Sequence, residues 1–394
     1  MSLEDVDLES LLDKDDLIGD FNEVFSSPYY LAHSTLSLNK AYVLNVDLNC
    51  DGTKYCASFS NRHVNVYTES LTTLCKLEPH EKSITQTSFS KTDPQLLFTS
   101  SSDCTIKLWD LRCSEKASRE FKDTSDHTKH EGPPRNPEKP ILCFDTSRDS
   151  RVVCAGTEQV GQDAYLLFWD MRAGPLMGGY WESHEDDITC IKFHPEKNDS
   201  MASGSTDGLV NVFDLNEGKE DDALLTCHNT EDSVSSLHWF SKKNNLRYLG
   251  IATHTESIQL WDTDDYQPYQ TIARSDVCHS IRRTVPEHSY IVGMHDQEEQ
   301  GFLVLAGSRY SLDPCLRLTT LKNKKLKPCG DLKDGKVGGG IVRCSAQLPS
   351  YSGFITGSEG GVVAVWRTGD QPAVQQITET FKIKNKISKR DNPY

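Results

Sequence analysis

Short alternating segments of apolar and polar residues recur along the chain, each preceded by a polar turn. The three best copies are SSDCTIKLWDLR (residues 101–112), STDGLVNVFDL (205–215) and HTESIQLWDT (254–263). Weaker copies occupy residues 61–68, 163–172, 314–320 and 360–367. A period of two places every second side chain on one face of a β-strand. The pattern therefore predicts seven similar β units.

One position near the end of each copy, usually aromatic, gives the spacing of the units. These positions are Tyr67, Trp109, Trp169, Phe213, Trp261, Thr319 and Trp366. Most intervals are close to the ~40–45 residues of a four-stranded propeller blade. Two intervals are longer. We expect insertions at residues 123–139 and 159–164, and we place residues 321–340 between the last two units.

Further strand signals precede each of these copies. One is an apolar alternation, as in Ile84, Thr87 and Phe89, and another is a short apolar run that ends in small residues, as in residues 96–101. Four strands per unit predict an all-β, seven-bladed β-propeller, because a closed ring leaves no exposed sheet edge. We expect residues 30–38 to supply the strand that closes the last blade, with residues 373–378 as the alternative.

The number and spacing of the copies, together with His80, Thr99, Asp103 and Trp109, resemble the WD-repeat family. The resemblance covers residues 30–368, and it implies that these four side chains form one hydrogen-bonded set. Such a set satisfies buried polar groups that would each cost ~1–3 kcal/mol if unpaired.

A partial set is expected in the fourth unit, where His184, Ser203 and Asp207 are present but Phe213 has no N–H to donate. In the fifth unit Ile251 occupies the hydroxyl position. We therefore expect Trp261 to contribute less through hydrogen bonding than Trp109.

Charge and cysteine content restrict the partners. The net charge is −16, from 42 Lys and Arg against 58 Asp and Glu, which disfavours general nucleic-acid binding and favours basic protein partners. No apolar run approaches the roughly 20 residues of a membrane span, and the acidic start MSLEDVDLES does not resemble a signal peptide. We expect an intracellular protein, in the nucleus or the cytoplasm. The 13 cysteines contain no CxxC pair, so we expect structural thiols and no metal site.

No constellation for catalysis or for a cofactor is apparent, and we expect a protein that is not an enzyme. His184 with Glu185 belongs to a blade turn, and His127 with His130 lacks the helical spacing of a zinc protease. Trp181 and Trp239 are both expected to pack in the core.

Partner binding is expected on the face formed by the turns that open each first strand and those that precede each aromatic strand, because binding residues concentrate on loops carried by a rigid scaffold. The residues expected there are Arg62, Glu81, Lys82, Gln159, Asp163, Glu185, Asp186, Thr206, Glu231, His254, His295, Arg309 and Glu359. Acidic residues outnumber basic ones in this set, which again indicates a basic partner.

Charged segments flank the propeller, and we divide the chain into residues 1–28, 29–368 and 369–394. In the acidic first segment, Leu8, Leu11 and Leu12 can share one helical face as an LxxLL docking peptide. The alternatives are a helix on its own propeller, or disorder. The basic tail, with FKIKNKISKR at residues 381–390, is a candidate nuclear-import signal or RNA contact, or else a strand on the ring.

The sequence therefore favours a monomeric, non-enzymatic scaffold or adaptor for protein partners. The second hypothesis is a substrate receptor of a cullin-4 ubiquitin ligase. The resemblance implies this role because residues 97–112 fit the box that docks on the ligase adaptor, with Arg112 and Arg172 as the docking side chains. A third is a factor for ribonucleoprotein assembly, resting on the tail and on residues 322–327.

Overall fold

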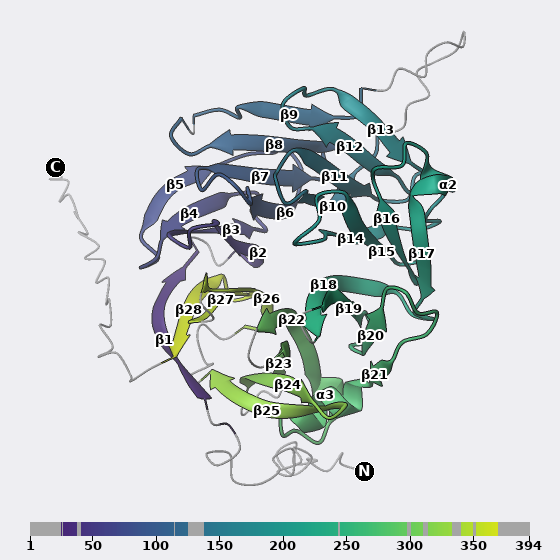
Figure 1. The fold of residues 1–394 in the computed structure, drawn as a ribbon. Helices are drawn as coiled ribbons and strands as arrows, with labels where there is room; N and C mark the ends of the chain where they lie inside the picture. Colours follow the sequence, from purple (N-terminus) through teal and green to yellow (C-terminus); the bar gives the residue numbers. More distant parts are fainter. Residues whose placement is uncertain are drawn as a thin grey trace, which may run out of the picture.

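Seven β-sheet blades surround a central axis in the computed structural model (Figure 1). The structure describes residue 25 and residues 27–37, 41–113, 115–124, 138–242, 245–297, 301–309, 314–332, 340–349 and 352–368. The segments 1–24, 125–137 and 369–394 lie outside the described residues. So do the predictions made for the LxxLL segment, for His127 and His130, for the alternative closing strand and for the basic tail. The predicted seven-bladed β-propeller is confirmed.

Each of the first five blades is a separate four-stranded sheet, and the last two are joined. Blades 1 to 7 begin at β2, β6, β10, β14, β18, β22 and β26. The strands are β1 (Ser27–Leu36), β2 (Val43–Leu48), β3 (Lys54–Phe59), β4 (Val64–Thr68), β5 (Thr73–Leu77), β6 (Ile84–Phe89), β7 (Leu96–Ser101), β8 (Thr105–Asp110), β9 (Arg119–Lys122), β10 (Ile141–Thr146), β11 (Val152–Thr157), β12 (Leu166–Asp170), β13 (Leu176–Tyr180), β14 (Ile188–Phe193), β15 (Ser200–Ser205), β16 (Leu209–Asp214), β17 (Leu224–Asn229), β18 (Val234–Lys242), β19 (Asn245–Thr253), β20 (Ile258–Asp262), β21 (Gln270–Ile272), β22 (Ser289–Gln297), β23 (Gly301–Ser308), β24 (Cys315–Lys322), β25 (Lys325–Leu332), β26 (Val342–Gln347), β27 (Gly353–Ser358) and β28 (Val362–Thr368).

The third strand of each blade carries the position that set the spacing in the sequence. These strands are β4, β8, β12, β16, β20, β24 and β28. All seven side chains are buried, and Trp169, Trp261 and Trp366 are among the largest fully buried ones. The alternating pattern therefore identifies the buried face of the third strand in every blade.

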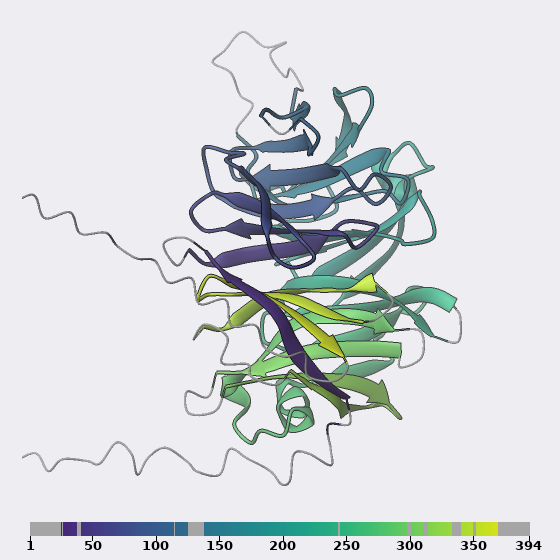
Figure 2. The ribbon, with the colours of Figure 1, turned by 90° about the vertical axis from the view of Figure 1, so that its left-hand side faces the viewer.

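The N-terminal strand joins the two ends of the ring. Strand β1 pairs antiparallel with β28, with Leu31 opposite Trp366, and its first residues pair parallel with β25, with Ser27 opposite Gly330. Blades 6 and 7 thus form one eight-stranded sheet in which β1 lies between β25 and β28. Figure 2 shows this purple strand crossing beside the yellow strands of the last blade.

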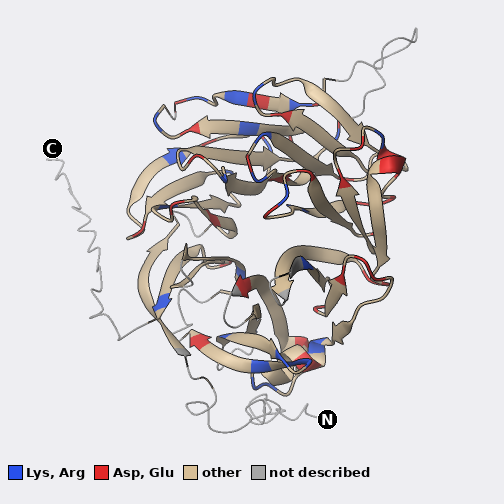
Figure 3. Ribbon diagram, viewed as in Figure 1, with Lys and Arg blue, Asp and Glu red and all other residues tan. Residues whose placement is uncertain are grey.

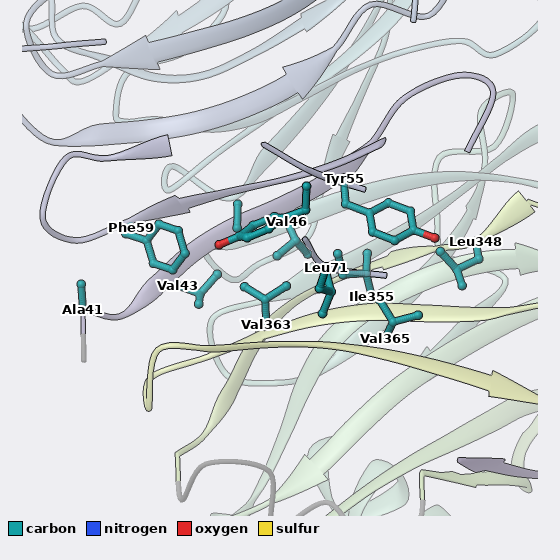
Figure 4. Packing of buried hydrophobic residues seen from close by; sticks show 12 residues of the cluster. Ala41, Val43, Val46, Tyr55, Phe59, Leu71, Leu348, Ile355, Val363 and Val365 are labelled. Carbon is teal, nitrogen blue, oxygen red and sulfur yellow. The ribbon is translucent and has the colours of Figure 1, made fainter. Parts of the chain in front are cut away.

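Apolar clusters fill the spaces between neighbouring blades. Between blades 7 and 1, Val43 and Tyr55 pack against Ile355, Val363 and Val365 (Figure 4). Each large apolar side chain that is fully buried contributes about 1.5–3 kcal/mol. The contact between the first and last blades is therefore built like the contacts between consecutive ones.

One expectation about insertions is wrong. Residues 321–332 are not a loop, because β24 and β25 form a tight hairpin through Asn323 and Lys324, which both have positive φ. This geometry is typical of two-residue hairpin turns. The long interval between Trp261 and Thr319 comes instead from α3 (Arg274–Ser280) and the 3₁₀ turn η2 (Pro286–His288), which precede β22.

The helices of the described segments are short. Besides α3 there is α2 (Glu220–Ala223), which precedes β17. None of the helices that the structure describes is long and apolar enough to cross a membrane.

Candidate functional site

Four side chains of blade 2 form a continuous hydrogen-bonded network. His80 Nδ1 lies 2.9 Å from Asp103 Oδ2, and His80 Nε2 lies 2.8 Å from Thr99 Oγ1. The indole Nε1 of Trp109 donates to Thr99 Oγ1 at 3.1 Å. Burial alone would raise the pKa of Asp103, but hydrogen bonds from His80 and Thr105 lower it to about 2. A charged Asp103 requires a proton on Nδ1, so Nε2 accepts the hydroxyl proton of Thr99.

The same arrangement is only partly present in other blades. In blade 4, His184 lies 3.1 Å from Asp207 and 2.7 Å from the Ser203 hydroxyl. Blade 7 holds a pair that the sequence reading missed, because Trp366 Nε1 donates to Thr356 Oγ1 at 2.9 Å. Thr356 precedes Trp366 by the same ten positions that separate Thr99 from Trp109, and that spacing was a usable signal.

In blade 5 the indole of Trp261 also has a hydrogen-bond acceptor. Its Nε1 donates to the side-chain oxygen of Gln259 at 3.1 Å. Ile251 does occupy the position equivalent to Thr99 on β19. Gln259 stands two residues before Trp261 on the same strand and replaces the hydroxyl. The prediction that Trp261 contributes less through hydrogen bonding than Trp109 was based on Ile251 alone. It did not take Gln259 into account.

One face of the propeller, here called the loop face, carries the turns between the second and third strands together with the loops between blades. In the later blades, each turn is hydrogen-bonded to a neighbouring loop. Examples are Thr206 N–H to Asp187 O, His254 N–H to Ser233 O and Arg309 N–H to His288 O, at 2.8 to 2.9 Å. Twelve of the residues expected at this face lie in these segments. Those that are exposed are Arg62, Glu81, Lys82, Gln159, Asp163, Glu185, Glu231, His254 and Arg309, whereas Asp186, Thr206 and Glu359 are partly buried.

His295 is the exception, and its placement on the loop face was wrong. It lies within β22 and is 7% exposed, and its Nε2 lies 3.0 Å from the hydroxyl of Ser345 on β26. The insertion of α3 and η2 shifts the start of blade 6 along the chain, so a polar stretch near residue 295 belongs to a strand and not to a turn.

Acidic residues are concentrated in the loops over blades 3 to 5. The segments 158–165, 181–187, 206–208, 230–233 and 254–257 contain ten Asp and Glu and no Lys or Arg. We call these five segments the acidic arc (Figure 3). Five of the ten carboxylates accept internal hydrogen bonds. Asp207 binds His184, Asp186 accepts the Asp187 N–H, Asp187 accepts the Gln159 N–H, Asp232 accepts the Thr255 hydroxyl and Glu256 accepts the Ile291 N–H.

Elsewhere on the loop face the charges are mixed and partly paired. Lys82 binds Glu138 at 3.0 Å, and Arg343 binds Glu359 at 2.6 Å. The guanidinium of Arg62 donates to the carbonyl of Glu81. The loop face is therefore electrostatically uneven, with its unbalanced negative charge over blades 3 to 5.

Arg112 and Arg172, the docking side chains of the ligase hypothesis, lie on the opposite face, in the turns between the third and fourth strands. The Arg112 side chain is 61% exposed, and its guanidinium donates to both carboxylate oxygens of Asp110, at 2.8 and 2.7 Å. Arg172 is exposed, and its backbone N–H donates to Asp170. The structure thus brings neither arginine near the acidic arc, and docking through them stays a prediction.

The innermost strands enclose a cavity of about 670 Å³ at the end of the central channel opposite the loop face. Its polar lining connects neighbouring blades. Asp47 accepts the N–H of Phe89 at 2.8 Å, and Asp145 accepts the N–H of Phe193 at 2.7 Å. Asp145 also binds the ammonium group of Lys91 at 2.9 Å. Burial raises the pKa of Asp47. These carboxylates link blade 1 to blade 2, blade 2 to blade 3 and blade 3 to blade 4.

The buried histidine of the channel predicts a loss of stability in acid. Burial, and secondarily the nearby Lys192 ammonium group, lowers the pKa of His295 to about 4. Because the unfolded chain protonates near pH 6.5, stability is complete above that pH and falls as the pH drops toward 4, by about 1–3 kcal/mol. We expect His295→Gln to reduce the pH dependence of the urea midpoint in this window, and the part that remains comes from His238, whose pKa burial lowers to about 3. The matched change His254→Gln, at an exposed histidine, is expected to leave it as in the wild type.

The two tryptophans expected in the core, Trp181 and Trp239, differ in their burial. Trp239 is 6% exposed, and its Nε1 donates to the Lys192 carbonyl at 3.0 Å. Trp181 is 53% exposed, so its assignment to the core was wrong. It follows the last residue of β13, where the chain leaves the sheet, and its backbone N–H donates to Glu220 at 2.9 Å.

The described residues offer little that resembles a reactive centre. No disulfide bond joins the cysteines that the structure describes, and burial raises the pKa of Cys143 and Cys154 well above the usual value. Within the described ranges, no group of three or more His, Cys, Asp or Glu is arranged to hold a metal ion. The side chain of His80, which is hydrogen-bonded through both ring nitrogens, is fully buried.

Sequence comparisons identify the repeat. The family model "WD domain, G-beta repeat" matches residues 71–110 and 178–214, which contain the networks of His80 and His184. The chain is 27% identical to the WD repeat-containing protein 89 homolog of Dictyostelium discoideum over 252 residues, or 63% of this chain and 62% of that protein. It is 26% identical to the Arabidopsis thaliana WD repeat-containing protein GTS1 over 84% of this chain and 82% of that protein.

A third relative, an uncharacterized WD repeat-containing protein of Saccharomyces cerevisiae, is 31% identical over 43% of this chain and 39% of its own length. The alignments thus span from about two fifths to four fifths of these relatives. Seven blades, the buried third-strand positions and the two matched repeats agree with one another. The chain is a seven-bladed β-propeller that contains WD40 repeats and is similar to the WD repeat-containing protein 89 homolog.

Proposed function

We propose that this protein is a non-enzymatic scaffold that binds a basic segment of a protein partner on the acidic arc of its loop face. Its WD-repeat relatives support a role in protein interaction. The observation that carries the proposal is the charge of the arc, with ten acidic residues and no basic one in five neighbouring loops.

Three carboxylates define the contact surface. Asp163, Glu185 and Glu231 come from successive blades and are exposed, and none of them forms an ion pair with another described residue. The Glu185 N–H donates to Asp207 of the neighbouring turn, whereas Asp163 and Glu231 are held by backbone hydrogen bonds within their own loops. These bonds fix the positions from which the charges are presented. A complementary basic partner would be steered by this field, and its association would weaken with salt.

The proposal places the protein inside the cell, in the nucleus or the cytoplasm. Cysteines that form no disulfide within the described residues are consistent with a reducing compartment. Docking of Arg112 on a ubiquitin-ligase adaptor is a separate prediction. Because Arg112 lies on the opposite face, substitutions in the arc leave that surface unchanged.

The test reverses the charge of the arc in the full chain. We expect Asp163→Lys, Glu185→Lys and Glu231→Lys together to reduce partner recovery by at least about tenfold in quantitative affinity purification, because attraction becomes repulsion. The matched control is Glu115→Lys, Glu217→Lys and Asp265→Lys, three exposed residues in turns of the opposite face. The control has the same net charge as the arc variant and is expected to keep the partners.

Equal partner sets in the two variants and the wild type would exclude the arc as the binding site. Equal losses in both variants would show that only net charge matters, which also contradicts the proposal. Raising the salt concentration during the wild-type purification provides a second readout, because a contact driven by exposed charges is screened over about 10 Å at 0.1 M salt.

A further inference from the structure

A basic groove lies on the circumference of the ring, away from the loop face and the channel. It is a cavity of about 650 Å³ between α3 and the first half of β25, next to β21. The helix and the strand lie side by side at the outer edge of blade 6 (Figure 1). Ile272 and Leu326 are the apolar members of its lining besides Pro328.

Four cationic side chains line this groove. Lys324, Lys325 and Lys327 come from the β24–β25 hairpin and are exposed, and Arg282 follows α3. None of the four forms an ion pair with a described acidic residue. The nearest acid, Asp276, accepts the N–H of Ala273 at 3.2 Å and so closes the first turn of its own helix. In a chain with a net charge of −16, this is an unbalanced positive site.

The described chain begins beside this groove. Phe25 is 6% exposed, and the guanidinium carbon of Arg317 lies 4.9 Å from the centre of its ring. Ser27 then pairs with Gly330 in the parallel ladder between β1 and β25. The preceding 24 residues therefore start at the edge of the strand that lines the groove.

The composition of that preceding segment is complementary to the groove. Residues 1–24 contain nine Asp and Glu against one lysine, Lys14, and eight of the remaining residues are Leu, Ile or Val. Attachment at Phe25 keeps the segment at a local concentration on the order of millimolar, so even weak contacts are populated.

We propose that the acidic N-terminal segment, residues 1–24, binds in the groove between α3 and β25. Its carboxylates contact Lys324, Lys325, Lys327 and Arg282, and its apolar residues cover Ile272 and Leu326. The segment shields the basic groove from other polyanions. This inference is independent of the acidic arc, which lies on a different surface of the ring.

The experiment uses the full chain with a fluorophore on its N-terminal amine. We expect the fluorescence anisotropy in low salt to be high in the wild type and to fall in the variant Lys324→Glu, Lys325→Glu, Lys327→Glu, because the segment is released. The control reverses three exposed lysines on other blades, Lys76→Glu, Lys116→Glu and Lys219→Glu, and is expected to keep the wild-type anisotropy. Adding about 0.5 M salt should lower the wild-type value to that of the groove variant.

Zero-length coupling of carboxylates to amines, followed by mass spectrometry, locates the contact in the unlabelled full chain. The expected products join residues 4–23 to Lys324, Lys325 or Lys327. Products that join the segment mainly to Lys382–Lys389 of the basic tail, or equally to Lys76 and Lys116, would overturn the proposal. So would equal anisotropy in the two triple variants.

A single-stranded oligonucleotide tests the competing occupant. The wild type is expected to bind it weakly, and a chain with the nine acidic residues changed to Asn or Gln is expected to bind it at least about tenfold more tightly, because the groove is then open. Equal affinities would show that the segment does not cover the groove.

Discussion

Removal of residues 1–36 is expected to abolish the folded monomer, whereas removal of residues 1–24 is expected to lower stability by less than about 1 kcal/mol. The longer deletion takes away β1, and with it the pairing with both β25 and β28. It also exposes the cluster in which Tyr29 packs edge to face on Phe354. We expect the free-energy cost of two unpaired sheet edges and an exposed core to exceed the roughly 5–15 kcal/mol that stabilise an ordinary domain.

Size-exclusion chromatography and thermal unfolding distinguish these outcomes. The deletion of residues 1–36 should elute as aggregate and lack a cooperative transition. The deletion of residues 1–24 retains Phe25 and every described strand, so it is the matched control. A cooperative, monomeric product from the longer deletion would mean that another segment closes the ring.

The second large effect is expected at Thr99. Thr99→Val keeps the volume of the side chain but removes the oxygen that contacts both His80 and Trp109. Two buried groups then lose their partner, and we expect a loss of about 2–4 kcal/mol in the free energy of unfolding. Urea denaturation followed by tryptophan fluorescence measures it.

Two substitutions provide the scale for that measurement. Thr356→Val leaves one buried group without its partner, the indole of Trp366, and Ser203→Ala leaves one, the imidazole of His184. Each is expected to cost about 1–2 kcal/mol. If Thr99→Val shifts the midpoint no more than Thr356→Val does, the blade 2 network does not act as a unit.

The repeat pattern predicted the blades because the signal is local. A third strand of five to eight residues with alternating burial, ending near a buried aromatic, can be recognised from its own sequence. Trp109, Trp169 and Trp366 illustrate this, and all three are buried. Even Thr319 was placed correctly, because its neighbours Leu316 and Leu318 keep the alternation.

The errors arise where long-range pairing determines the structure. Residues 325–332 are rich in lysine and include Pro328, so their local sequence resembles a loop. They form β25 because β24 and β1 supply partners on both sides. His295 and Trp181 were misplaced for a related reason. The ends of β22 and β13 depend on the strands that pair with them, and polarity alone did not locate those ends.

The site was predicted less completely than the fold. The acid residues of the loop face were identified because turns are polar and their spacing is regular. Their concentration over blades 3 to 5 became visible only when Asp163, Glu185 and Glu231 were placed on consecutive blades. The basic groove combines α3, β21 and β25, and the local sequence indicated neither α3 nor β25 as an element.

The position of β1 has a consequence for synthesis on the ribosome. This strand is translated first, yet one of its partners, β28, emerges more than 300 residues later. At the ~5–20 residues per second of translation, β1 waits on the order of tens of seconds before its sheet can form. During that time its backbone donors and acceptors are open to other chains. A chaperone that acts during translation, and releases the nascent chain only after the last strand has emerged, would protect this interval.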